Sequence, residues 1–185
     1  HESYKPHLEK LFKKENRQSS SELVVYENDK TIDIKEENIV WTIDSNERNP
    51  EGIHGAGGAK AALVFGAKFG NGRGLQGSSY ALVTKNLNAG FIEKSTGIKY
   101  EVAGFCSVSE SQIKTNINEL YDCARNNPEK SFLITYQYES WPNGTPKKSL
   151  NGYTSQEMLE MFMHKDIPEN IIFHDSYKPY LEKLL

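Results

Sequence analysis

The sequence has little of what marks a small secreted protein or a membrane protein. Its 185 residues include two cysteines, Cys106 and Cys123, too few for the disulfide framework of a small secreted domain, so we expect free, buried thiols. No apolar run approaches the roughly 20 residues that span a bilayer, and no signal-peptide pattern is present. We therefore expect a soluble protein without a membrane partner, either cytoplasmic or delivered into a host cytosol.

Strong charge is also missing. The formal net charge is −3 and no stretch is rich in Lys and Arg, which argues against a general nucleic-acid binder, because such binding depends on neutralising phosphates. No set of His, Cys, Asp and Glu has the spacing of metal ligands, so we expect neither a metal nor another cofactor. The length suits one α/β domain.

The two ends of the chain resemble each other. HESYKPHLEKLF at 1–12 and HDSYKPYLEKLL at 174–185 share nine of twelve residues. Because self-similarity at a fixed spacing is typical of repeats, we expect one unit of a tandem multidomain protein, with the neighbouring units as partners. Each copy predicts a short amphipathic helix that docks or links units, with Pro6 or Pro179 in its first turn. An unrelated duplication of a linker is the alternative.

The expected organisation is a terminal helix and linker over 1–22, one domain over 23–173, and a helix over 174–185 that leads to a next unit. Within the domain, β-prone runs predict strands at 23–26, 31–34, 38–43, 79–84, 98–103, 131–138 and 170–173. Two helices begin with capping boxes, one formed by Ser109 and Gln112 and the other by Thr154 and Glu157. Strands that alternate with helices predict a mixed, mostly parallel sheet covered on both faces, with a binding crevice at the carboxyl ends of the strands.

Nine of the fourteen glycines lie between Gly52 and Gly77, around an alanine-rich run that predicts a helix over 57–69. Glycines before a helix allow free N–H groups to approach an anion, which favours a nucleotide-diphosphate pocket. GRGLQG at 72–77 matches the GxGxxG pattern, but it follows a helix and precedes a strand, the reverse of the dinucleotide-binding context. The run 55–60 has neither the spacing nor the Ser/Thr of a nucleotide-triphosphate loop.

Several of these motifs together resemble those of macro domains, and most closely a macro-like family of bacterial and phage proteins. The matching runs are SN at 45–46, HGAGGAKAA at 54–62, GRGLQGSSYA at 72–81, TK at 84–85, ARNNPEKSFLITYQ at 124–137, LNGYTSQEMLEMF at 150–162 and PENIIFHDSY at 168–177. The resemblance implies a macro-like three-layer α/β/α sandwich with a mixed, mostly parallel sheet.

The resemblance also implies a ligand. Macro domains bind ADP-ribose, and some hydrolyse ADP-ribosyl bonds. By that resemblance Asn46 contacts the distal ribose, the glycine loop after it holds the diphosphate, and a second loop faces it, with Tyr153 near the distal end. The implied ligand-binding residues are Asn46, His54, Gly55, Ala56, Gly57, Gly58, Gln76, Gly77, Ser78, Asn151, Gly152 and Tyr153. The expected partner is ADP-ribose or a related nucleotide, free or carried on an ADP-ribosylated protein.

The chain departs from the family pattern in three places. Residues 139–148, ESWPNGTPKK, are an apparent insertion that either forms a surface loop or supplies Trp141 and Lys147 to a modified ligand. Val83 stands where the family has proline. Lys60 stands where some macro hydrolases have an acidic residue, which argues against a direct transfer of their mechanism.

Three functions therefore remain open. The first is binding of ADP-ribose or of an NAD-derived relative. The second is an ADP-ribosyl hydrolase that removes ADP-ribose from a modified target with water activated near Asn46 and His54, the two candidate catalytic residues. The third is a structural repeat whose pocket is closed by the insertion. We interpret His7, His164 and His174 as surface residues.

Overall fold

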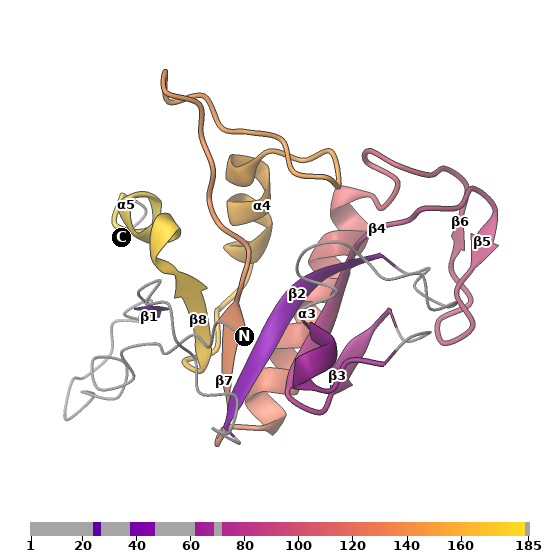
Figure 1. Cartoon of the computed structure of the whole chain (residues 1–185), viewed down its shortest axis with the longest axis horizontal. Coiled ribbons are helices and arrows are strands. Elements are labelled where there is room, and N and C mark those ends of the chain that lie inside the picture. Colours follow the sequence, from indigo (N-terminus) through magenta and orange to yellow (C-terminus); the bar gives the residue numbers. More distant parts are fainter. Residues whose placement is uncertain (1–23, 27–37, 47–61, 69–71, 184–185) are drawn as a thin grey trace.

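The computed structural model describes residues 24–26, 38–46, 62–68 and 72–183 (Figure 1). Within these residues the chain forms one mixed, mostly parallel sheet, as predicted, and its strand order is β1-β8-β7-β2-β4-β3. The strands are β1 (Val24–Tyr26), β2 (Ile39–Asn46), β3 (Gly74–Gln76), β4 (Ser79–Lys85), β7 (Ser131–Ile134) and β8 (Ile171–His174). All neighbouring pairs are parallel except β3 and β4, and β5 (Phe91–Ile92) and β6 (Lys99–Tyr100) form a separate hairpin.

The core lies between this sheet and two helices, α3 (Glu110–Asn126) and α4 (Ser155–Phe162). Alternate residues of the strands, including Val40, Phe132 and Phe173, belong to the same buried cluster as the apolar side chains of α3 and α4. The helices are joined by the hydroxyl of Tyr121, which donates to the carbonyl of Phe162 at 2.6 Å. Both capping boxes are present as predicted.

The opposite face of β2 carries Trp41, because successive side chains of a strand point to opposite faces. The Trp41 ring lies 4.7 Å from the ring of Phe65 in η1 (Leu63–Phe65), a short 3-10 helix. The described part of the chain thus has helical structure on both faces of the sheet. It has no helix long and apolar enough to cross a membrane.

The helix predicted over 57–69 ends earlier than expected. Ala62 is α-helical and leads into η1, and the helical run stops at Gly66, whose φ of 98° is left-handed. The N–H of Ser78 donates to the carbonyl of Phe65 at 2.7 Å, so the β3–β4 turn takes a carbonyl that a continuing helix would use. Residues 57–61 and 69 lie outside the described residues.

Two predicted strands are shorter than expected. The strand predicted over 131–138 ends at Ile134, and only Lys99–Tyr100 of the run 98–103 is a strand. The other strands predicted within the described residues are confirmed, with β2 reaching Asn46 as its last residue. The strand predicted over 31–34 lies outside the described residues.

The C-terminal segment is part of the domain. β8 extends to His174 and is followed by η2 (Asp175–Tyr177) and α5 (Lys178–Leu181). Tyr177 and Leu181 belong to the main core cluster. That the segment 174–185 leads to a next unit stays a prediction. His174 is 5% exposed, so its interpretation as a surface residue is wrong. The similar run at 1–12 and any neighbouring unit lie outside the described residues.

A polar network ties the β5–β6 hairpin to the sheet. The guanidinium of Arg73, just before β3, donates to both carboxylate oxygens of Glu93 and, at 2.8 Å, to Glu119 of α3. The side chain of Glu93 is fully buried, and burial alone would raise its pKa. Bonds from Arg73, Ser95 and Tyr100 outweigh burial and lower that pKa, so Glu93 stays ionised.

Candidate functional site

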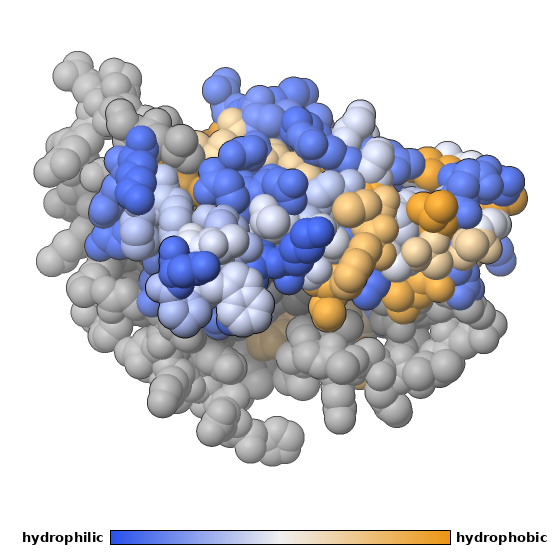
Figure 2. Space-filling view, turned by 90° about the horizontal axis from the view of Figure 1, so that it is seen from above, coloured by the Kyte–Doolittle hydropathy of each residue, from blue (hydrophilic) through white to orange (hydrophobic). Residues whose placement is uncertain are grey.

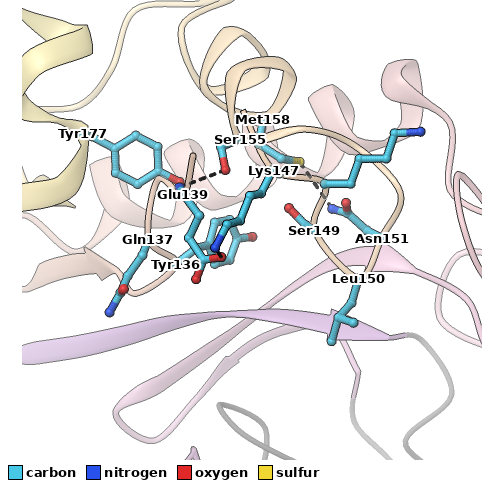
Figure 3. Close-up of a pocket in the computed structure, with 11 residues that line it drawn as sticks. Tyr136, Gln137, Glu139, Lys147, Ser149, Leu150, Asn151, Ser155, Met158 and Tyr177 are labelled. Carbon is cyan, nitrogen blue, oxygen red and sulfur yellow. Dashed lines mark hydrogen bonds and ion pairs between the residues drawn. The ribbon is translucent and has the colours of Figure 1, made fainter. Parts of the chain in front are cut away.

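A pocket of about 380 Å³ opens at the carboxyl end of β7 (Figure 3). Its lining residues are Tyr136, Gln137, Glu139, Lys147, Lys148, Ser149, Leu150, Asn151, Ser155, Met158 and Tyr177. Because β7 is parallel to both β2 and β8, the pocket lies at the edge of the sheet where these three strands end. Ligands bind at this edge in open α/β sheets, and the sequence predicted a crevice there.

The pocket forms because the chain leaves the sheet after Ile134. The N–H and the hydroxyl of Thr135 both donate to the carbonyl of Thr42, at 3.1 and 2.7 Å, and these bonds end the pairing with β2. Further along, the N–H of Tyr138 donates to the hydroxyl of Ser176 at 2.8 Å. The intervening Tyr136 and Gln137 line the pocket.

Residues 139–147, which we call the arm, contain most of the apparent insertion and project from the domain (Figure 1). The base of the arm is closed by two bonds of about equal length, Lys147 N–H to the Glu139 carbonyl and Ser155 N–H to the Lys147 carbonyl, both 2.9 Å. The Glu139 N–H also donates to the Ser155 hydroxyl at 3.0 Å. The arm therefore forms a wall of the pocket and does not close it.

Two opposite charges meet on this wall. The Lys147 ammonium lies 3.9 Å from a Glu139 carboxylate oxygen and 4.9 Å from the centre of the Trp141 ring. Figure 3 shows the Lys147 and Glu139 side chains converging over Tyr136. Trp141 itself is 56% exposed. An ammonium held between a carboxylate and an aromatic face is suited to exchange partners with an incoming anion.

Asn151 places an amide in the pocket. Its side chain oxygen accepts the Tyr153 N–H at 3.0 Å, and its side chain nitrogen donates to the sulfur of Met158 at 3.3 Å. Asn151 is 1% exposed, and its second amide hydrogen has no acceptor among the described residues. Since a thioether is a weak acceptor, this amide keeps most of its donor capacity for a ligand.

Gly152 and Tyr153, predicted with Asn151 as the second phosphate loop, are used within the fold. The Gly152 N–H donates to the Ser149 carbonyl at 3.0 Å, and a Cβ at Gly152 would lie 2.7 Å from the Cys106 nitrogen. The Tyr153 hydroxyl donates to the Val108 carbonyl at 2.9 Å. Burial and the neighbouring Cys106 raise the pKa of Tyr153. Both residues thus join the loop to the segment before α3, and neither lines the pocket.

The first predicted phosphate loop is described only at its start. Asn46 is the last residue of β2 and pairs with Lys85 after an irregularity in register. This places its backbone at the same edge of the sheet as the pocket, as predicted. The Asn46 side chain and the segment His54, Gly55, Ala56, Gly57 and Gly58 lie outside the described residues, so their roles stay predictions.

Gln76, Gly77 and Ser78 lie at the other edge of the sheet. They form the turn before β4, and the Trp41 N–H near the start of β2 donates to the Ser78 carbonyl at 2.9 Å. Since β2 and β4 are parallel, the length of a strand separates this turn from Asn46. The Gln76 side chain oxygen accepts the Lys68 N–H at 2.8 Å. The structure does not bring these three residues together with Asn151.

Exposed apolar side chains also gather at the carboxyl edge. Figure 2, which looks onto this edge, shows hydrophobic atoms collected on one part of an otherwise mostly hydrophilic face. Phe105 is 68% exposed and Leu150 is 75% exposed, and their loops are joined by the Cys106 N–H, which donates to the Asn151 carbonyl at 2.7 Å. No local sequence pattern predicts this pairing, because it depends on a long-range contact.

Neither cysteine forms a disulfide, as expected. Cys106 is exposed and Cys123 is half-buried, so the prediction of buried thiols is wrong for Cys106. Burial raises the pKa of Cys123. The described residues contain no group of three or more His, Cys, Asp or Glu that could hold a metal ion.

Comparisons with protein-family models, with curated proteins and with solved structures find no match for this chain. The residues of the pocket itself indicate the chemistry of the site. Its lining combines two lysines, one buried amide, two serines and aromatic rings around a single carboxylate. This set can bind an anionic, hydroxyl-bearing ligand.

Proposed function

We propose that this domain is macro-like and binds ADP-ribose, or an NAD-derived nucleotide that contains it, at the carboxyl edge of the sheet. The observation that carries the proposal is the position of the pocket: it opens beside the end of β2, where Asn46 stands, and Lys147 and Asn151 supply donors there. The resemblance of the glycine-rich segment to macro domains supports the same ligand.

The ligand has three chemical parts, and the described edge offers a contact for each. Lysine and amide N–H groups suit the diphosphate. The hydroxyls of Ser149 and Ser155, which line the pocket, suit ribose hydroxyls, since a hydroxyl can both donate and accept hydrogen bonds. Phe105 and Leu150 offer an exposed apolar surface for the adenine ring. The arm and the loop 148–153 would face the predicted glycine loop across the ligand.

Calorimetric titration with ADP-ribose, NAD, AMP and adenosine tests the proposal. We expect micromolar binding of ADP-ribose, about −8 kcal/mol, that is lost in Asn46→Ala. Ser78→Ala, at the opposite edge, is the control and should bind as the parent protein does. No binding of any nucleotide by the folded parent protein would refute the proposal, and equal loss in both variants would refute the position of the site.

The pocket also bears on the two other functions. A structural repeat was expected to have its pocket closed by the insertion, whereas the arm lines a pocket of about 380 Å³. Hydrolysis of an ADP-ribosyl bond depends on the side chains of Asn46 and His54, and no specific contact among the described residues favours it over binding.

A further inference from the structure

Lys147 stands out among the charged residues of the pocket because it is held in place while its charge stays within reach of a ligand. Its side chain is 36% exposed, and its ammonium lies between the Glu139 carboxylate and the face of Trp141. Both ends of the arm are fixed by backbone bonds at Glu139 and Lys147. The ammonium is therefore positioned at the pocket before any ligand enters.

The ion pair that holds Lys147 is weak. The two charged atoms are 3.9 Å apart, longer than a charge-assisted hydrogen bond of about 2.8 Å, and the Glu139 side chain is 59% exposed. Exposed ion pairs at this distance contribute little, since water and salt screen them. A diphosphate, with two negative charges and several acceptor oxygens, can displace such a carboxylate.

A second, independent group points to the same ligand chemistry. Asn151 is 1% exposed and has a spare amide hydrogen at the pocket. Burial without a strong acceptor is unfavourable for an amide N–H, so the site gains when an acceptor enters. Lys147 and Asn151 both line the pocket, one as a cation and one as a neutral donor.

The following inference rests on the proposed function. We propose that Lys147 is the phosphate-binding cation of this site and that the Glu139 carboxylate pairs with Lys147 while the pocket is empty. A diphosphate-containing ligand replaces Glu139 as the ion-pair partner of Lys147. The Asn151 side chain donates a hydrogen bond to the same diphosphate. The class of ligand selected is a nucleotide with a diphosphate bridge, bound more tightly than a monophosphate, with a nucleoside bound weakest. Glu139 acts as a built-in competitor that sets the affinity.

Substitutions of the two charges should act in opposite directions. Lys147→Met should weaken ADP-ribose binding about tenfold or more, the usual loss for a charge-assisted hydrogen bond. Glu139→Gln should tighten it about threefold or more, since removing an exposed ion-pair partner frees Lys147. Lys130→Met is the control: it changes the net charge equally, but Lys130 precedes β7 at the opposite edge of the sheet. Adenosine binding should not change in any variant.

Fluorescence gives a readout that a merely structural role would not move. The chain has two tryptophans, so Trp41→Phe leaves Trp141 as the sole reporter. In that background ADP-ribose should change the emission of Trp141, because the ammonium beside the ring changes partner. The change should disappear when Lys147→Met is added, while the thermal midpoint of the protein stays the same.

The outcomes separate this inference from the proposed function. If the parent protein does not bind ADP-ribose, both fall. If it binds, and either Lys147→Met binds equally well or Glu139→Gln binds no more tightly, the role of this pair is refuted while the proposed function stands. Opposite shifts with an unchanged Lys130→Met control would establish it.

Discussion

Gly66 and Gly77 are in backbone contact, so that a Cβ built on either residue would lie 3.2 Å from the Cα of the other. Both have positive φ, 98° and 57°. Gly66 ends η1 and Gly77 forms the turn before β4, so the pair packs a short helix against the amino end of the sheet. Gly66 and Gly77 of the glycine-rich segment therefore allow close backbone packing, and both lie far from the pocket.

Gly77→Ala should therefore lower the free energy of unfolding by about 2 kcal/mol or more. The alanine would be strained in the left-handed backbone conformation, and its Cβ would also be too close to neighbouring backbone atoms. The new Cβ would lie 3.0 Å from the Phe65 carbonyl oxygen. Gly74→Ala is the matched control, because its φ is 84° but nothing lies within 4 Å of its Cβ position. It should cost about 1 kcal/mol in urea denaturation. Equal losses would contradict the importance of the Gly66–Gly77 contact.

Arg73→Met should destabilise the protein by about 3–5 kcal/mol, since it leaves the fully buried Glu93 carboxylate without its cation. Glu119→Gln removes the second acidic partner of Arg73 and should cost less than about 1 kcal/mol, because the Glu119 side chain is 46% exposed. Chemical denaturation of the two variants measures the difference. Similar small losses would show that Glu93 is solvated or protonated in the folded protein.

Stability should fall in mild acid because of His174. Burial lowers its pKa from 6.5, an effect that neighbouring Asp175 opposes only in part. Below about pH 6.5 the unfolded chain therefore binds more protons than the folded chain, and the free energy of unfolding decreases as pH falls. His174→Asn keeps a side-chain acceptor for the Ser176 N–H. It should flatten the pH dependence below about pH 6.5, and an unchanged slope would assign the effect to other groups.

Phe105→Ala should weaken ADP-ribose and AMP about tenfold, because base–aromatic stacking contributes about 1–3 kcal/mol. Ribose 5-phosphate, which has no base, should bind as before. The thermal midpoint should hardly change, since Phe105 is 68% exposed. Ile92→Ala, 56% exposed on the β5–β6 hairpin, controls for the loss of an exposed apolar side chain. Equal weakening of all three ligands would show that Phe105 does not contact the base.

Local patterns predicted most of the fold. The capping boxes of Ser109 and Thr154 are correct because their signals lie within four residues of each other. The strands predicted at 38–43, 79–84 and 170–173 are confirmed. Residues 79–84 and 171–174 are all buried, as expected for strands covered on both faces of a sheet. The errors lie where a distant segment decides the structure, as when the turn at Ser78 takes the carbonyl of Phe65.

The site was harder to predict for the same reason. Asn151 was expected from a family resemblance, and the structure places it in a pocket. The lining residues Tyr136 and Tyr177 were missed, because long-range contacts such as the bond from Tyr138 to Ser176 bring their segments together. Lys147 was noted as part of an insertion, but its pairing with Glu139 depends on how the arm closes. Sequence alone could not distinguish a surface loop from a pocket wall.

The strand order also constrains how the protein is made. β1 has β8 as its neighbour in the sheet, so the first described strand pairs with the last one, nearly the whole chain later. At the usual pace of about 5–20 residues per second, a ribosome would release β1 many seconds before its partner exists. During that interval this strand lacks the hydrogen-bonding edge that it will occupy. Completion of this sheet therefore waits for the synthesis of β8.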